Sequence, residues 1–150
     1  MNDVVLNDAP SEGSAIAKLP ALGAIVALAG LADAAYLTVH HLTEEPVPCT
    51  IVAGCETVLT SSYAQIAGIP LAAFGAAGYF LAFSLALLAV FGNRVTWMLF
   101  GVQVVLMSIF TLWLLYLQGY VIGAFCQFCL ISAFTTFSML GIFIASRFTR

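Results

Sequence analysis

The chain has 150 residues, enough for one domain, and its composition is dominated by apolar side chains. Hydrophobic residues make up 63% of it and charged residues 7%, whereas about 25% of a soluble globular protein is charged. Because these few charges cannot cover a water-exposed surface, most of the chain is expected to be solvated by lipid. The sequence has no basic patch to meet a phosphate backbone, which argues against nucleic-acid binding.

Four long apolar runs follow a short polar segment at the start of the chain. Residues 1–18 are rich in acidic and small side chains and are predicted to be a disordered tail. Each apolar run is long enough to cross a bilayer core of about 30 Å. The predicted spans are about 19–41, 66–91, 95–117 and 121–146, followed by a short end at 147–150. This pattern predicts an all-α integral membrane four-helix bundle with an outer loop between the first two spans.

The third and fourth spans are separated in this prediction at Gln118-Gly119-Tyr120. That tripeptide is the one polar, glycine-bearing break in the uncharged stretch from Val95 to Ser146. A single helix over that stretch would be far longer than a bilayer requires.

The basic residues predict the orientation of the bundle. With four spans, every lysine and arginine falls on one side: Lys18, Arg94, Arg147 and Arg150. The positive-inside rule makes that side, and with it both termini, cytoplasmic. All four cysteines then lie at the opposite face. In a bacterial inner membrane that face is oxidising, and disulfides form and persist there.

The cysteines form two pairs. Cys49 and Cys55 lie in the polar loop, and the five residues between them allow the two sulfurs to meet. Cys126 and Cys129 have C-x-x-C spacing, which places both on one face of a helix. A helix N-terminus favours the thiolate and makes such a pair reactive.

This arrangement predicts two redox pairs at one membrane face, with electrons passing between them. The alternative is a non-catalytic tetraspan protein whose cysteines are structural or inert. A metal site is not expected, because C-x5-C is a poor half-site for zinc and disulfide formation competes for the thiolates.

A dithiol held in the membrane face must pass two electrons to a lipid-soluble acceptor, and its location therefore favours a quinone. Asp33, a carboxylate within the first span, is a candidate for proton handling. His40 and His41 follow at the end of that span, where they are either proton relays or simply a solvated helix end.

From about residue 19 to 146 the chain resembles the vitamin K epoxide reductase family in its bacterial form. The resemblance rests on four pieces: the Cys49-x5-Cys55 pair, the stretch CETVLTSSY at 55–63, Gly68-Ile69-Pro70 before the second span, and Cys126-Gln127-Phe128-Cys129 in the last span. In the other quinone-linked family, that of the disulfide-bond formation protein B, the C-x-x-C lies in the first outer loop.

The resemblance implies a membrane thiol oxidase that supports disulfide-bond formation, built around a bound ubiquinone or menaquinone. Cys49 would exchange with a periplasmic thioredoxin-like protein, Cys55 would pass electrons to Cys126, and Cys129 would sit against the quinone. Ser61 would lie near the quinone; otherwise it caps a neighbouring helix. Many bacterial members carry a thioredoxin-like domain after the last span, whereas this sequence ends at Arg150. The partner is therefore expected to be a separate protein.

Two departures from the animal members bear on the substrate. Their asparagine that holds the vitamin K ring has no equivalent near Leu71, and their tyrosine one turn after the last active-site cysteine aligns with Ala133. The resemblance therefore implies quinone reduction rather than epoxide reduction.

Overall fold

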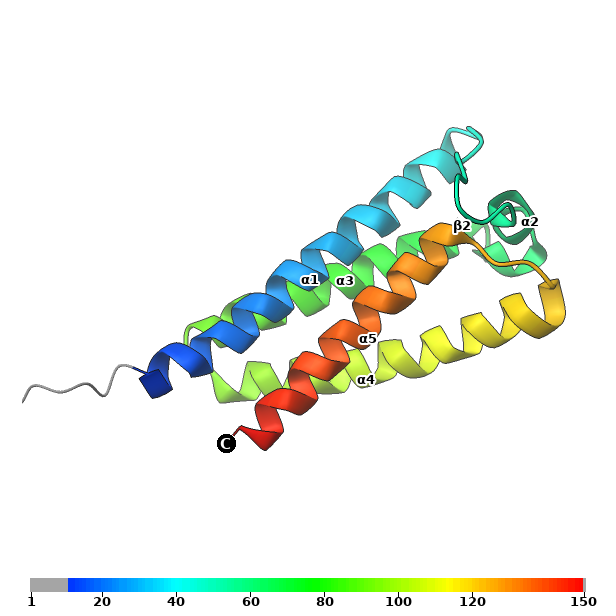
Figure 1. Cartoon of the computed structure of the whole chain (residues 1–150). Helices are drawn as coiled ribbons and strands as arrows, with labels where there is room; N and C mark the ends of the chain where they lie inside the picture. Colours follow the sequence, from blue (N-terminus) through cyan, green and yellow to red (C-terminus); the bar gives the residue numbers. More distant parts are fainter. Residues whose placement is uncertain (1–10, 150) are drawn as a thin grey trace, which may run out of the picture.

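The computed structural model describes residues 11–149, with side chains from residue 18 to 149, as a bundle of long helices (Figure 1). These helices are α1 (Ser11–Leu42), α3 (Leu71–Val90), α4 (Arg94–Tyr116) and α5 (Gln127–Phe148). Within residues 11–149, four helical segments are long and apolar enough to cross a membrane. The prediction of an all-α membrane four-helix bundle is confirmed.

Within the bundle, α1 and α4 each pack against both α3 and α5. Small residues let the helices approach closely, which is how helices associate in lipid. Gly30 of α1 lies directly against the ring of Tyr79 on α3, so that a side chain at this position would overlap the ring. On α4 near its N-terminus, Trp97 stacks on Phe100 with ring centroids 4.8 Å apart and donates a hydrogen bond to Ser146 (2.9 Å). This end of the bundle is therefore a closed core.

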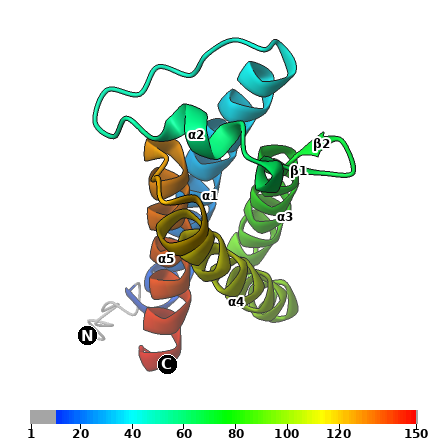
Figure 2. The ribbon, with the colours of Figure 1, turned by 90° about the vertical axis from the view of Figure 1, so that its right-hand side faces the viewer.

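The opposite end carries the polar connector between α1 and α3 (residues 43–70), which contains several short elements. They are α2 (Cys55–Leu59), the 3₁₀ turn η1 (Ser62–Ala64), and the antiparallel strands β1 (Gln65–Ile66) and β2 (Ile69–Pro70). Gly68 takes a positive φ of 82° in the hairpin turn, a conformation that glycine adopts at little cost. Figure 2, which views this end, shows the connector and α2 lying across the helix ends.

The first candidate membrane span, Lys18–Leu42, agrees with the predicted 19–41, but its helix and the second long helix begin at other residues than the apolar pattern predicts. Because α1 begins at Ser11, residues 11–18 are helical rather than disordered. Extending an existing helix costs little, and the small and long-chain residues here are compatible with it. The rest of the predicted tail, residues 1–10, and Arg150 lie outside the described residues. The second long helix begins at Leu71 instead of residue 66, because residues 65–70 pair as a hairpin.

The predicted break at Gln118–Tyr120 is also misplaced. After α4 the chain continues as a π-helical segment, η2 (Leu117–Ile122), turns at Gly123 (φ 73°), and starts α5 at Gln127 instead of residue 121. The reason lies in Gln118. Its side chain is buried and its amide oxygen accepts a hydrogen bond from the backbone N–H of Cys126 (3.1 Å). The polar residue is therefore satisfied inside the protein and does not mark a solvent-exposed turn.

Candidate active site

The structure brings all four cysteines to one end of the bundle. Cys49 and Cys55 form a disulfide, with their Cα atoms 6.2 Å apart, whereas Cys126 and Cys129 are free. Cys55 is the first residue of α2, and Cys126 is the N-cap residue directly before α5. Both Cys55 and Cys126 are fully buried and belong to one packed cluster, with Cys49 and Cys129 at its edge. One residue of each pair is therefore placed in the interface between the connector and α5.

A glycine allows this close approach. A Cβ atom on Gly54 would meet the backbone nitrogen and oxygen of Phe125 and would come within 3.1 Å of the Ala124 side chain. The φ angle of Gly54 is −97°, which other residues also adopt, so space rather than backbone conformation requires glycine here. The connector thus runs directly against the segment that leads into Cys126.

Cys126 is the thiol of its pair whose ionisation the surroundings favour. The hydrogen bond from the Cys129 thiol, followed by the backbone N–H groups of Cys129 and Phe128, lowers the pKa of Cys126 to about 7. Burial of the sulfur and the charge of nearby Asp33 act in the opposite direction and are outweighed. A lowered pKa raises the ionised fraction near neutral pH, and the thiolate is the form that attacks or leaves in disulfide exchange.

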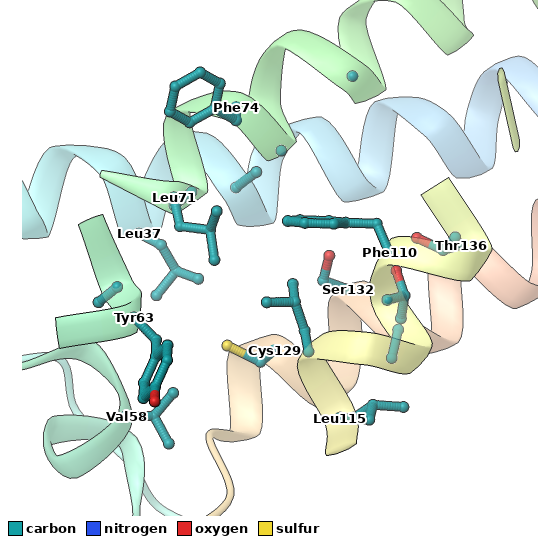
Figure 3. Close-up of a pocket in the computed structure, with 18 of the residues that line it drawn as sticks. Leu37, Val58, Tyr63, Leu71, Phe74, Phe110, Leu115, Cys129, Ser132 and Thr136 are labelled. Atoms are coloured by element: carbon teal, nitrogen blue, oxygen red, sulfur yellow. The ribbon is translucent and has the colours of Figure 1, made fainter. Parts of the chain in front are cut away.

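Beside Cys129 lies a cavity of about 360 Å³. Figure 3 shows the sulfur of Cys129 pointing into this space, with Leu37 and Leu71 on the opposite side. The volume falls within the roughly 300–1,000 Å³ typical of small-molecule sites. Its lining side chains come from the four long helices and from the short elements at this end, and they are mainly apolar, including Leu37, Leu71, Phe74, Phe110 and Leu115.

Several polar side chains also line this cavity. Asp33 lines it, and its Oδ2 atom is buried without a hydrogen-bond partner within the described part of the chain. Ser61 lines it too; its hydroxyl donates to the carbonyl of Val58 (2.6 Å) and makes no capping bond to η1. Tyr79 also lines the cavity, and its hydroxyl lies 2.7–2.8 Å from oxygens of three residues on α5: Ser132, Thr135 and Thr136.

The two candidate histidines have different surroundings. His41 borders the cavity, and its Nε2 atom accepts a hydrogen bond from the side-chain amide of Gln65 (2.7 Å). His40 packs its ring 4.3 Å from that of Tyr36, and its Nδ1 atom is buried without a partner among residues 18–149. A proton-relay role for either remains a prediction.

Sequence reasoning missed Tyr79 and Gln118 as parts of this site. Both line the cavity and both are buried. The available signal was that each is a polar side chain inside an otherwise apolar membrane segment, since such groups usually serve a specific partner.

The fold and the site define a class of membrane protein: a four-span bundle with a disulfide in the connector at one end, two free cysteines beneath it and an apolar cavity beside them. The model of the vitamin K epoxide reductase family matches residues 21–144, and the chain belongs to that family. The resemblance predicted from the cysteine motifs is thereby confirmed.

A curated relative agrees with this assignment. The chain is 33% identical over 116 residues to the thiol-disulfide oxidoreductase LTO1 of Arabidopsis thaliana. The match covers 71% of the chain and 31% of that relative, so the chain spans about a third of the relative's length.

Proposed function

We propose that this protein is a membrane thiol oxidase that passes electrons from a periplasmic thioredoxin-like dithiol protein to a quinone, and so supports disulfide-bond formation. One observation carries the proposal. The oxidised pair Cys49–Cys55 and the reduced pair Cys126/Cys129 share one buried cluster, and Cys129 faces an apolar cavity. In this state the protein is ready to accept electrons at the connector and to give them up at the cavity.

The transfer between pairs requires two exchange steps. Once the partner has reduced the connector disulfide, the Cys55 thiolate attacks the sulfur of Cys126 in an oxidised Cys126–Cys129 bond, and Cys129 leaves with the electron pair. Cys49 then attacks Cys55 and releases Cys126 as a thiolate. The lowered pKa of Cys126 makes it a good leaving group in this second step.

The walls of the cavity suit a quinone such as ubiquinone or menaquinone. A quinone accepts two electrons and two protons and dissolves in the bilayer. The apolar side chains provide surfaces for a flat ring, while Ser61 and the unpartnered oxygen of Asp33 offer polar contacts for ring oxygens. We assign Cys129 the position next to the ring and Asp33 the delivery of a proton. The residues at the two animal vitamin-K-binding positions, Leu71 and Ala133, support quinone reduction rather than epoxide reduction.

The proposed location is a bacterial inner membrane, with the cysteines at the outer face and both termini in the cytoplasm. Support comes from charge. Of the described residues, the basic Lys18, Arg94 and Arg147 lie at the end of the bundle away from the cysteines. Three glutamates, Glu44, Glu45 and Glu56, lie at the cysteine end.

The test is quinone reduction by protein reconstituted in vesicles, with either reduced thioredoxin or a small membrane-permeant dithiol as donor. Cys129→Ala should abolish turnover with both donors. Cys49→Ala should abolish turnover with thioredoxin but keep it with the small dithiol, because that donor can reach the inner pair directly. Full turnover by Cys129→Ala, or equal loss with both donors in Cys49→Ala, contradicts the assigned roles. Thiols at 126 and 129 that carry no electrons would instead support the non-catalytic tetraspan alternative.

A further inference from the structure

The side chain of Gln127, between the two cysteines of the C-x-x-C motif, binds the outer connector. Its Oε1 atom accepts hydrogen bonds from two consecutive backbone N–H groups, those of Thr50 (3.2 Å) and Ile51 (2.9 Å). Both partners are donors, so only the oxygen of the amide can serve this contact. The two bonds join positions 77 and 76 residues apart in the sequence.

Together with the buried side chain of Val47, these two bonds hold the segment that carries Cys49. Within the described residues, no other hydrogen bond joins residues 46–54 to an element outside the connector. The segment has no regular secondary structure, and Pro46 and Pro48 lack the N–H group that a helix or strand would use. Thr50 and Ile51 directly follow Cys49, so the bonds to Gln127 fix the Cys49 half of the connector.

The Cys55 half is held differently. Cys55 is fully buried in the cluster with Cys126, and Gly54 lies against the backbone of Phe125. While the Cys49–Cys55 disulfide is closed, it ties the two halves together. Once it opens, the contact with Gln127 is what keeps Cys49 beside the cluster.

We propose that Gln127 is a positioning residue that holds the Cys49 thiol in reach of the Cys55–Cys126 mixed disulfide, so that Cys49 resolves it. In that step the Cys49 thiolate attacks Cys55, the Cys49–Cys55 bond forms, the Cys55–Cys126 bond breaks, and Cys126 takes the electron pair as a thiolate. The proton of Cys49 goes to the water that bathes the exposed connector. The inference rests on the proposed function, since it concerns a step of the proposed relay.

The test compares two substitutions of equal length. Gln127→Met removes the accepting oxygen, whereas Gln127→Glu keeps an oxygen that can accept both N–H groups. During turnover with reduced thioredoxin, acid quenching and mass spectrometry measure the fraction of Cys55–Cys126 mixed disulfide. Loss of two hydrogen bonds predicts that Gln127→Met slows this turnover by about tenfold and accumulates the mixed disulfide. Gln127→Glu should keep both the turnover and the fraction of mixed disulfide at their wild-type values.

Quinone reduction by the small dithiol bypasses the connector and should stay at the wild-type rate in both variants, which shows that the bundle and the cavity are intact. Gln127→Met without mixed-disulfide accumulation, or Gln127→Glu behaving like Gln127→Met, overturns the inference. The wild-type protein distinguishes a failure of the role of Gln127 from a failure of the proposed function. If it reduces quinone with thioredoxin while Gln127→Met is unaffected, only the role of Gln127 fails. If it cannot oxidise thioredoxin at all, the proposed function fails.

Discussion

The close contact between the connector and the segment before α5 makes Gly54→Ala a sharp perturbation. The added methyl group would overlap the backbone of Phe125, which cannot rotate away as a side chain could. Overpacking of this kind costs about 1–3 kcal/mol. If the connector relieves the overlap by moving away from Cys126, the docked population, and with it the rate of exchange between the pairs, falls by roughly 5- to 150-fold.

The assay for Gly54→Ala is again quinone reduction with two donors. Turnover with reduced thioredoxin should fall by the factor given above, and turnover with the small dithiol should stay unchanged. Gly141→Ala is the matched control, because a Cβ at this α5 position meets nothing within 4 Å, and this variant should behave as wild type with both donors. Wild-type thioredoxin turnover by Gly54→Ala would refute the claim that close docking of the connector permits the transfer.

Three further predictions concern individual groups. The ultraviolet absorbance of the Cys126 thiolate should appear with a midpoint near pH 7, its lowered pKa, so the thiolate is lost as the pH falls through that value. Removing the hydrogen bond with Cys129→Ala should move the midpoint to higher pH, and an unmoved midpoint would contradict this cause. Asp33→Asn keeps the shape but cannot deliver a proton, so quinone reduction by the small dithiol should drop at least about tenfold while exchange between the pairs continues; unchanged quinone reduction excludes Asp33 as the donor. Tyr79→Phe should lower the free energy of unfolding in detergent by about 1 kcal/mol, because it removes the hydroxyl that bonds Ser132 and its neighbours, and equal stability would show that this network contributes nothing.

Much of the fold follows directly from the sequence. Because charged residues are costly in lipid, the few charges separate long uncharged runs, and each such run must cross the membrane as a helix. Four apolar runs predicted four membrane helices, and the described part of the chain has four helices long and apolar enough to cross a membrane. Helix ends were less predictable, since they depend on contacts between distant residues. The break after α4 illustrates this: Gln118 looked like a surface turn residue but binds the N–H of Cys126 within the protein.

The site, too, was predicted in part: its cysteine pairs follow from the sequence, but the contacts between them do not. The spacing of Cys49 and Cys55 and the C-x-x-C motif predicted two pairs, and the structure places both at one end of the bundle. What the spacing could not reveal was how they meet, because that depends on Gly54 passing against Phe125 and on Gln127 reaching the connector. These contacts join residues more than seventy positions apart, so no pattern in the local sequence predicts them.

The most direct test of the relay is to leave one cysteine of each pair in place and ask whether they join. With Cys49→Ala and Cys129→Ala combined, Cys55 and Cys126 remain, and mild oxidation should produce a Cys55–Cys126 disulfide, detected by mass spectrometry without reduction. With Cys55→Ala and Cys129→Ala combined, Cys49 and Cys126 remain and should join much more slowly. A protein in which Cys55 and Cys126 stay as free thiols, or join no faster than Cys49 and Cys126, contradicts the proposed electron route.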